Sequence, residues 1–362
     1  MRDEFHPLAI AAVRRETADA LSFALAVPER LSETFRHRPG QHLIVRATLG
    51  GEEVRRTYSI SSDPTDPQLW ITIKRVSGGV FSSHAHDSLG AGATIEAMRP
   101  AGRFVAPDDG GEERRTYLAI AAGSGITPVM ALIRHVLARE PRSSFTLIYG
   151  NRSVDSIIFR QGLDDLKDRY LGRLSVLHVL SRDTEAEVPL LSGRIDGAKT
   201  RQLLPLIAGP GDIDQVYLCG PGDLIKNART ALLGAGVARE RIHFEYFRAG
   251  SEPAEHRAAP PRLPEAVAAA GAEVIAVVDG ARHTFRVPPG GLVVDAALAA
   301  GVRVPYSCKG GMCCTCRAKL VEGQVHMVRN FSLEPWEMEA GFVLTCQSQP
   351  ISGRVVLDYD QM

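Results

Sequence analysis

The sequence predicts a multidomain protein with an antiparallel β-barrel domain, an α/β domain built on a parallel sheet, and a smaller α+β domain. The chain has 362 residues, more than one ordinary hydrophobic core accommodates. The strand and helix pattern changes near Thr116. Residues 249–271 contain four prolines and no apolar periodicity, which is typical of a linker. We therefore expect domains at 1–110, 111–248 and 272–362, with a linker at 249–271.

Short β-rich runs separated by Gly, Pro and Asp turns fill the first hundred residues or so and predict the barrel. Its expected strands include 43–47, 56–60 and 69–75. After Thr116, strands and helices alternate, which is typical of a parallel sheet with helices packed on it. The expected strands are 117–122, 144–149, 174–180 and 215–219, and the expected helices are 128–138, 157–167 and 223–233.

The last domain begins with two expected strands, 274–278 and 284–287, and a short helix at 292–300. A cysteine-rich loop follows directly. This order of strand, strand, helix and loop resembles the β-grasp ferredoxin fold.

Four cysteines form the most specific pattern in the chain. Cys308, Cys313 and Cys316 have the C-x4-C-x2-C spacing of a plant-type [2Fe–2S] loop, and Cys346 supplies the distant fourth thiolate. Two tetrahedral irons bridged by two sulfides leave four positions open, and a tight loop can fill three of them. The spacing therefore predicts an electron-carrying centre. Cys314 is expected not to be a ligand, because choosing it would break both spacings.

A structural zinc site is the alternative for these four cysteines. Zinc modules usually present two short knuckles of the C-x2-C or C-x2-H type. The spacing in this chain favours the iron–sulfur cluster.

Composition narrows the class of protein. Lys and Arg together number 42 and so do Asp and Glu, so the balanced charge gives no sign of nucleic-acid binding. No apolar run reaches the length of a membrane span, and the first residues lack the apolar core of a signal peptide. With most of the six cysteines assigned to the cluster, no disulfide framework remains. We expect a cytoplasmic protein without a membrane or nucleic-acid partner.

A flavin site is predicted in the barrel. Arg56, Tyr58, Ser59 and Ser62 form an R-x-Y-S-x-x-S pattern that resembles the signature of the ferredoxin–NADP reductase superfamily. The resemblance implies that Arg56 holds the flavin pyrophosphate, Tyr58 packs on the isoalloxazine ring and Ser59 hydrogen-bonds near its N5 atom. A planar redox ring needs an aromatic wall, and a diphosphate needs a permanent cation. The alternative is an ordinary β-strand with alternating side chains.

A second segment, containing Gly79, Val80 and Ser82, resembles the G-x-x-S element that binds the flavin phosphates in the same superfamily. Free N–H groups at a helix start suit an anion. The resemblance favours FAD over FMN.

Two glycine-containing motifs follow strands of the predicted α/β domain, the context that a pyrophosphate site requires. They resemble the G-x-G-x-x-P and C-G-P motifs of the same superfamily, in which the cysteine lies against the nicotinamide. The alternative for each is a plain strand–helix turn. The candidate residues are Gly123, Gly125, Thr127, Cys219, Gly220 and Pro221.

Three further residues bear on the choice of nucleotide. Ser181 and Arg182 resemble the S-R pair that contacts the 2′-phosphate in NADP-using relatives, and Arg152 lies in another basic loop. A dianion needs such partners, so we expect NADPH rather than NADH.

Phe247, in a terminal E-x-F pattern with Glu245, resembles the residue that covers the flavin from its far side.

The domain order resembles the reductases of multicomponent oxygenases. Within that group, residues 149–160, 307–323 and 344–347 resemble the family of reductase subunits of phenylacetyl-CoA 1,2-epoxidase complexes. The resemblance implies that electrons pass from NADPH through FAD and a [2Fe–2S] cluster to a diiron oxygenase. Tyr58, Ser59 and Cys219 would then be the catalytic residues. The alternatives are a reductase for a Rieske or other oxygenase, such as a steroid hydroxylase, and a non-enzymatic Cys-rich metal-binding module.

Overall fold

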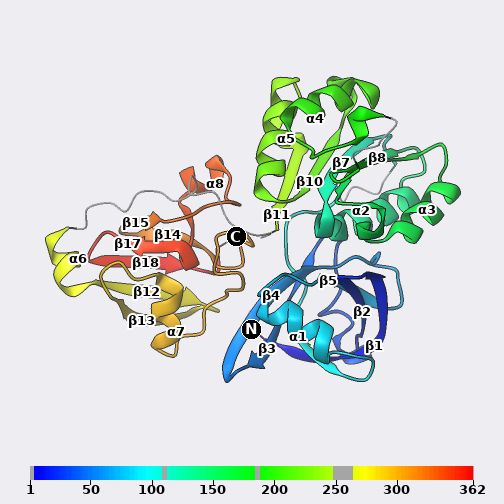
Figure 1. Cartoon of the computed structure of the whole chain (residues 1–362). Coiled ribbons are helices and arrows are strands. Elements are labelled where there is room, and N and C mark those ends of the chain that lie inside the picture. The colour runs from blue at the N-terminus through cyan, green and yellow to red at the C-terminus, as the bar shows by residue number, and fades with distance from the viewer. Residues whose placement is uncertain (1–3, 108–111, 184–187, 248–263, 362) are drawn as a thin grey trace. The chain divides into compact units, whose positions relative to one another are not determined.

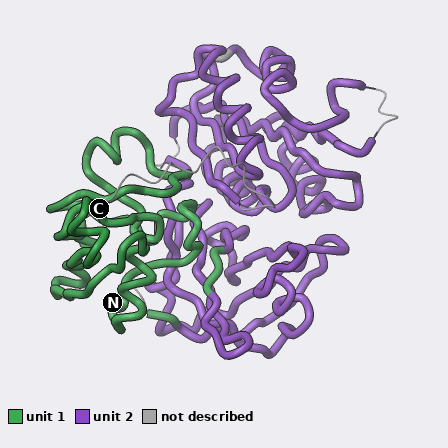
Figure 2. The backbone as a smooth tube through the Cα atoms, turned by 60° about the vertical axis from the view of Figure 1, so that its left-hand side comes forward, with its two compact units in different colours: residues 1–5, 55–57, 251–362 green, residues 6–54, 58–250 purple. Residues whose placement is uncertain are grey.

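The computed structural model describes residues 4–107, 112–183, 188–247 and 264–361. Their contacts divide the chain into two compact units (Figure 2). Unit 1 comprises residues 1–5, 55–57 and 251–362, and unit 2 comprises residues 6–54 and 58–250. Unit 2 contains most of the barrel and all of the α/β domain, whereas unit 1 contains the C-terminal module.

The barrel is a six-stranded sheet with the strand order β4-β3-β6-β1-β2-β5, and it lies at the N-terminal, blue end of Figure 1. An antiparallel bridge between Ile60, just after β4, and Ile71 in β5 joins the two ends of the sheet and closes it. The strands are β1 (His6–Thr17), β2 (Ala20–Ala26), β3 (His42–Leu49), β4 (Glu52–Ser59), β5 (Leu69–Lys74) and β6 (Thr94–Ala97). Helix α1 (Val80–Ser88) buries Phe81 and Ala85 in the barrel core.

The α/β domain has a parallel sheet of five strands in the order β11-β10-β7-β8-β9. The strands are β7 (Thr116–Ala122), β8 (Ser144–Asn151), β9 (Leu174–Leu180), β10 (Gln215–Gly220) and β11 (Ile242–Tyr246). The helices are α2 (Ile126–Arg139), α3 (Arg160–Arg169), α4 (Gly197–Leu203) and α5 (Gly222–Gly234). The parallel α/β architecture predicted from the alternation of elements is confirmed.

Alternating side chains of the central strands explain why helices cover both faces of this sheet. Tyr117 and Ala119 of β7 pack against α2 and α3. Leu118 and Ile120, which point to the opposite face, pack against α4 and α5. A strand that is buried on both faces has a continuous run of apolar residues in the sequence. Strand β7 has such a run.

Helix α3 starts later than the sequence predicted. The expected start was residue 157, but residues 157–159 are not helical and Phe159 has a left-handed backbone with φ of 60°. Ile157 and Ile158 are buried in the core instead. Their burial requires a turn of the chain before the helix can begin.

The C-terminal module contains a mixed sheet in the order β13-β12-β18-β14-β16 and a second pair of strands, β15 (Val325–Met327) and β17 (Ser348–Pro350). The strands of the larger sheet are β12 (Ala272–Val278), β13 (Ala281–Val287), β14 (Arg317–Glu322), β16 (Phe342–Leu344) and β18 (Arg354–Asp358). Helix α7 (Val293–Ala299) buries Val293, Val294 and Ala297 in the core of this module. A short helix, α8 (Pro335–Glu339), precedes β16.

Part of the expected linker is helical. Residues 249–263 lie outside the described residues, but α6 (Glu265–Ala270) occupies most of the remainder. Its alanines favour helix, Pro264 precedes its first turn, and Gly271 ends it with φ of 70°. In the described part of the chain, no helix combines the length and the apolar character needed to cross a membrane.

The buried carboxylate of Glu140 links Tyr117 of β7 to Ser143, which lies just before β8. The Tyr117 hydroxyl donates to both oxygens of Glu140, at 2.8 and 2.9 Å, and the Ser143 hydroxyl donates to one of them at 2.8 Å. Burial, followed by the contact with Glu140, raises the pKa of Tyr117. The phenol therefore remains a donor at all ordinary pH values.

Substituting Tyr117→Phe should lower the free energy of unfolding by about 1–3 kcal/mol, because the buried carboxylate of Glu140 loses a donor. Urea unfolding followed by circular dichroism measures this. Tyr170→Phe, at a half-buried tyrosine of the same domain, is the control and should stay within about 0.5 kcal/mol of the wild type. Equal stability of the Tyr117→Phe variant and the wild type would contradict this view of Glu140.

Candidate functional site

The carboxyl end of the parallel sheet brings the two predicted nucleotide motifs together. Strands β7 and β10 are neighbours, with Ala121 paired to Cys219, and the chain continues from them in opposite directions across the sheet. Ligands of open α/β sheets bind at such a switch point. Gly123 and Gly125 follow β7, and Gly220 and Pro221 follow Cys219 at the end of β10.

Gly125 makes the close contact between these motifs. A Cβ atom at this position would lie 2.2 Å from the carbonyl oxygen of Cys219 and 2.9 Å from the amide nitrogen of Gly220. Any side chain larger than hydrogen would therefore push the two turns apart. The hydroxyl of Thr127 donates back to the Ser124 carbonyl at 3.0 Å, so its side chain shapes the turn.

Cys219 is fully buried. Burial, and secondarily the charge of Glu245, raises the pKa of its thiol. The sulfur therefore stays protonated and neutral at physiological pH.

The ends of β8 and β9 bring the predicted 2′-phosphate residues together. The amide of Ser181 donates to the Asn151 carbonyl, and the amide of Arg182 donates to the Arg152 carbonyl, both at 2.9 Å. The side chains of Arg152 and Arg182 are exposed. Two guanidinium groups thus extend from adjacent strand ends on the same edge as the Gly123 turn, which suits an anionic nucleotide.

The predicted flavin residues of the barrel lie at the end of β4. Arg56 is exposed and donates one N–H to the carbonyl of Arg55 at 2.7 Å. The half-buried ring of Tyr58 lies 5.7 Å from that of Phe81 in α1. Ser59 is buried, and its hydroxyl donates to the Oε2 atom of Glu245 at 3.3 Å.

Gly79, Val80 and Ser82 form the start of α1, with Gly79 at the N-cap. The Ser82 hydroxyl accepts from the Val76 amide at 3.1 Å and donates to the Gly79 carbonyl at 3.2 Å. Gly79 has no side chain to cap the helix, and amides at a helix start suit an anion. A helix start beside the aromatic pair of Tyr58 and Phe81 fits the phosphates and ring of a flavin nucleotide.

Phe247 follows β11, is partly buried against the core of the α/β domain, and donates its amide to the Gly220 carbonyl at 3.2 Å. The E-x-F segment therefore lies directly against the C-G-P motif. Ser59 and Cys219 both lie beside Glu245, since the Ser59 hydroxyl donates to its carboxylate and Cys219 pairs with it across neighbouring strands.

Sequence reasoning missed two residues at this site. The Nδ1 atom of His42 in β3 lies 3.2 Å from the Oε1 atom of Glu245. The ammonium of Lys74, at the end of β5, lies 3.9 Å from the position of a Cβ atom on Gly123. Neither belongs to a spaced motif, and only folding brings them to the site.

The four predicted cluster ligands converge in the C-terminal module. Hydrogen bonds from the thiols of Cys313 and Cys346 are the main cause that lowers the pKa of Cys308. Contacts with Cys308 and Cys316, aided by burial, raise the pKa of Cys346. Hydrogen bonds place the distant cysteine against the loop: the amide of Thr345 donates to the Cys316 carbonyl at 3.2 Å, and the Gln347 side-chain amide donates to the Lys309 carbonyl at 2.8 Å.

Polar groups surround these sulfurs. The Gly310 amide donates to the Cys308 sulfur at 3.3 Å and the Thr315 hydroxyl to the Cys313 sulfur at 3.2 Å. Such donors stabilise thiolates and tune a cluster. Cys314 instead points to the Ser332 hydroxyl, 3.1 Å away.

The zinc alternative concerns the same four cysteines. Within the described ranges, no three His, Cys, Asp or Glu side chains are arranged to hold a single metal ion. A two-iron cluster spreads its four thiolates over two centres. The choice between zinc and an iron–sulfur cluster therefore rests on the spacing of the four cysteines.

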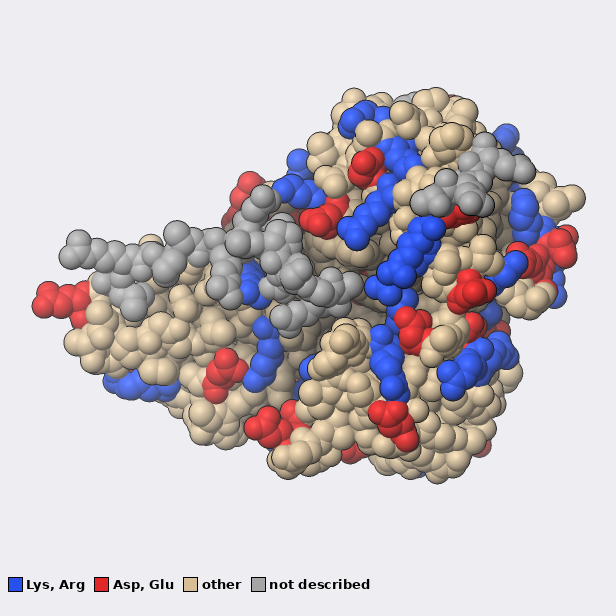
Figure 3. Space-filling model, viewed as in Figure 1, with Lys and Arg blue, Asp and Glu red and all other residues tan. Residues whose placement is uncertain are grey.

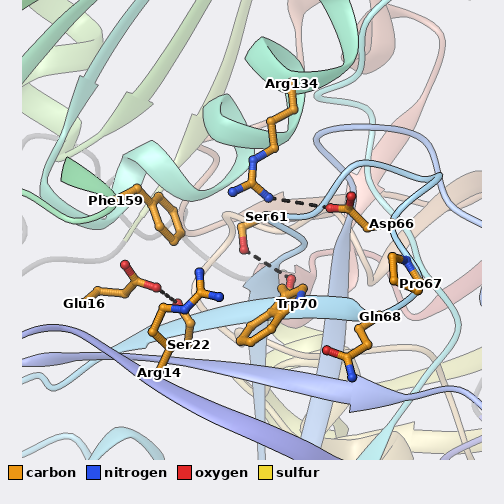
Figure 4. Close-up of a pocket in the computed structure, with 10 residues that line it drawn as sticks. All are labelled: Arg14, Glu16, Ser22, Ser61, Asp66, Pro67, Gln68, Trp70, Arg134 and Phe159. Atoms are coloured by element: carbon orange, nitrogen blue, oxygen red, sulfur yellow. Dashed lines mark hydrogen bonds and ion pairs between the residues drawn. The ribbon is translucent and has the colours of Figure 1, made fainter. Parts of the chain in front are cut away.

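A cavity also lies between the barrel and α2 of unit 2, and it shares no residue with the predicted sites (Figure 4). Arg134 of α2 pairs with Asp66 across it at 3.6 Å, and the Arg14 guanidinium lies 5.0 Å from the centre of the Trp70 ring. The Arg134 cation is thus matched by Asp66, whereas the Arg14 cation lies over an aromatic ring. On the face seen in Figure 3, basic and acidic side chains are likewise interspersed.

Three family models match the chain in consecutive segments. An oxidoreductase FAD-binding domain matches residues 7–105, an oxidoreductase NAD-binding domain matches residues 119–230, and a 2Fe-2S iron-sulfur cluster binding domain matches residues 276–350. The first covers the barrel, the second the parallel sheet and the third the cysteine-rich module.

The chain is similar over its length to components of known oxygenase systems. It is 42% identical to one of the subunits of 1,2-phenylacetyl-CoA epoxidase from Escherichia coli K12, over 98% of both chains. It is 34% identical to the ferredoxin reductase component of 3-ketosteroid-9-alpha-monooxygenase of Rhodococcus rhodochrous, over 97% of this chain and 96% of that protein.

A solved structure shares the complete domain set. Phthalate dioxygenase reductase, described as a modular structure for electron transfer from pyridine nucleotides to [2Fe-2S], superposes with a TM-score of 0.59 at 26% identity, covering 98% of each chain. These matches and the three domains exclude the non-enzymatic reading. The chain belongs to the ferredoxin–NADP reductase superfamily, within its family of oxygenase reductases that carry FAD- and NAD-binding domains and a C-terminal [2Fe–2S] ferredoxin domain.

Proposed function

We propose that this reductase takes electrons from NADPH and delivers them, through FAD and the [2Fe–2S] cluster, to the diiron oxygenase of a phenylacetyl-CoA epoxidase. One observation supports the electron path most directly. The carboxylate of Glu245 accepts a hydrogen bond from Ser59 of the barrel and acts electrostatically on Cys219 of the α/β domain. The end of β4, which carries Ser59, and the end of β10, which carries Cys219, therefore both lie beside the Glu245 carboxylate. The choice of oxygenase rests on the 42% identical relative.

The proposed contacts with FAD and the nicotinamide nucleotide come from the barrel and the α/β domain. For FAD they are Arg56, Tyr58, Ser59, Gly79, Val80, Ser82 and Phe247. For the nicotinamide nucleotide they are Gly123, Gly125, Thr127, Arg152, Ser181, Arg182, Cys219, Gly220 and Pro221. The proposed cluster ligands are Cys308, Cys313, Cys316 and Cys346.

FAD, when bound, accepts two electrons as a hydride and releases them singly, which matches a two-electron donor to a one-electron carrier. The protein supplies the surroundings. Tyr58 and Phe247 provide aromatic walls, and the neutral Cys219 thiol fills the floor of the nicotinamide site without adding charge. Ser59 supplies a hydroxyl whose direction is fixed by Glu245. Tyr58, Ser59 and Cys219 remain our proposed catalytic residues.

We propose domain limits of 1–110, 111–248 and 272–362. The described elements follow this order, although α6 falls within the expected linker at 249–271. A cytoplasmic location suits a protein whose six cysteines, all among the described residues, form no disulfide.

A second candidate partner is the oxygenase of a steroid monooxygenase system. It is favoured by the 34% identity to a 3-ketosteroid-9-alpha-monooxygenase reductase. The lower identity ranks it behind the epoxidase.

Cys346→Ala should remove the visible absorbance of the cluster, because one iron loses a thiolate. FAD content and NADPH-dependent reduction of ferricyanide should persist, since the cysteines lie in a separate unit. Cys314→Ser is the matched control and should keep full iron content. An intact cluster in Cys346→Ala, or its loss in Cys314→Ser, would refute the ligand assignment.

Arg182→Ala should weaken the use of NADPH by about 10- to 100-fold in kcat/KM, because a charge-assisted bond to the 2′-phosphate contributes roughly 1.5–3 kcal/mol. NADH lacks that phosphate, so its kcat/KM should change less than about twofold. Steady-state ferricyanide reduction with each nucleotide measures both values. Equal losses with the two nucleotides, or a wild type that prefers NADH, would contradict the assignment.

Reconstitution tests the proposed partner. Wild-type reductase, the oxygenase subunits, phenylacetyl-CoA and NADPH should together form the epoxide, detected by mass spectrometry. The Cys346→Ala variant should reduce ferricyanide but form no epoxide. Failure of the wild type to support epoxidation while it reduces ferricyanide would rule out this partner, and turnover with a ketosteroid monooxygenase instead would establish the second candidate.

A further inference from the structure

We propose that His42 is a positioning residue for flavin reduction: its imidazole fixes the Glu245 carboxylate, which in turn fixes the direction of the Ser59 hydroxyl. This inference rests on the proposed role of Ser59 beside the flavin. It concerns only residues of the barrel and the α/β domain that belong to the same compact unit.

Both oxygens of Glu245 are held by the barrel. The Nδ1 atom of His42 lies 3.2 Å from Oε1, and the Ser59 hydroxyl lies 3.3 Å from Oε2. The His42 side chain is 2% exposed and that of Glu245 is 14% exposed. Two contacts in such a buried place restrict the carboxylate to one orientation.

The proton positions follow from what each group can do. An ionised carboxylate only accepts hydrogen bonds, so Nδ1 of His42 carries a proton and donates it. The Nε2 atom is buried and has no hydrogen-bond partner among the described residues. The contact with Glu245 is therefore the polar contact that orients this imidazole.

The neighbouring backbone is shaped around the imidazole. Ala101 and His42 exchange two backbone hydrogen bonds, at 2.8 and 2.9 Å. Gly102 follows with φ of +113°, and a Cβ atom there would lie 2.9 Å from Nδ1 of His42. Only glycine leaves the ring its place against this turn.

The fixed Glu245 carboxylate determines whether the Ser59 hydroxyl donates a hydrogen bond to a flavin or accepts one from it. Because the hydroxyl hydrogen is directed to Glu245, the oxygen presents its lone pairs to other neighbours. Lone pairs accept a hydrogen bond from the N5–H group of reduced FAD, whereas the unprotonated N5 of oxidised FAD offers them no donor. The arrangement therefore favours the reduced form.

Electrons and protons balance in the hydride transfer from the nicotinamide to FAD. The nicotinamide C4–H bond breaks, and its hydride carries two electrons and one proton to N5, forming the N5–H bond and the oxidised nucleotide. Without His42, Glu245 can turn away, and Ser59 is then free to donate its hydrogen to the N5 of oxidised FAD. A variant without His42 should therefore stabilise oxidised FAD relative to reduced FAD.

The test compares FAD midpoint potentials and hydride-transfer rates in the holoprotein. His42→Leu should shift the ratio of reduced to oxidised FAD about tenfold toward oxidised, which is about 30 mV lower for a two-electron couple. Stopped-flow reduction by NADPH should slow about tenfold, with KM for NADPH unchanged. His42→Asn, whose amide occupies the Nδ1 position, should restore most of both values.

Two controls keep the test decisive. His243→Asn removes a partly buried histidine of β11 that bonds to Gln215 at 2.7 Å instead of Glu245, and it should leave the potential unchanged. In a Glu245→Ala background, which removes the acceptor of the His42 contact, adding His42→Leu should change neither the potential nor the rate, because His42 acts through the Glu245 side chain. If His42→Leu does not fold, His42→Gln, whose amide lies at the Nε2 position, should show the same lowered potential.

An unchanged potential in the folded, FAD-containing variants would overturn the proposal, as would losses that simply add to those of Glu245→Ala. None of these measurements involves an oxygenase. A wrong choice of partner therefore leaves them unaffected, and a failure here leaves reconstituted epoxidation intact.

Discussion

The close approach of Gly125 to the carbonyl of Cys219 is the constraint on which the nucleotide half of the protein depends. A Cβ atom would come within 2.2 Å of that oxygen, so the turn after β7 and the turn after β10 can share the sheet edge only with glycine at this position. This contact places the predicted pyrophosphate turn beside the buried Cys219 thiol. The same strand end leads, through the hydrogen bond between Phe247 and Gly220, to the segment that carries Glu245. Packing at one residue thus sets the geometry of the nicotinamide site.

Glu245 extends this constraint to the barrel. Its carboxylate contacts Ser59 and His42 of the barrel, although the residue itself belongs to β11. A partly buried charge is costly unless its oxygens are hydrogen-bonded, and here each oxygen has a partner. The barrel and the α/β domain are therefore joined by a polar contact at the place where the two cofactors must meet. Hydride transfer requires such a fixed relation between donor and acceptor.

The α/β domain and the cluster loop could be predicted because local patterns in the sequence determine them. The buried strands of the α/β domain, such as β7, are short apolar runs. The cysteine spacing identifies the cluster loop without any knowledge of the fold. Strands β1 and β2 were not singled out, and in β1 the alternation of buried and exposed residues breaks at the exposed run Val13, Arg14 and Arg15. The start of α3 was misplaced because Phe159 adopts a left-handed conformation that its residue type does not favour.

The site was less accessible from sequence. His42, Ser59 and Glu245 come from three strands, and 203 residues separate His42 from Glu245. No spacing rule connects them, and only the closed barrel packed on the parallel sheet brings them together. Glu245 was noticed only as part of a terminal E-x-F pattern. The residues that determine proton positions were therefore visible only in the folded protein.

The central claim is that a nicotinamide nucleotide, a flavin and an iron–sulfur cluster form one electron path within a single chain. Anaerobic titration of the holoprotein with NADPH, followed by visible absorbance and electron paramagnetic resonance, tests it most directly. The account predicts bleaching of both the flavin and the cluster bands and the appearance of the signal of a reduced [2Fe–2S] centre. Bleaching of the flavin alone, with the cluster still oxidised in excess NADPH, would contradict it.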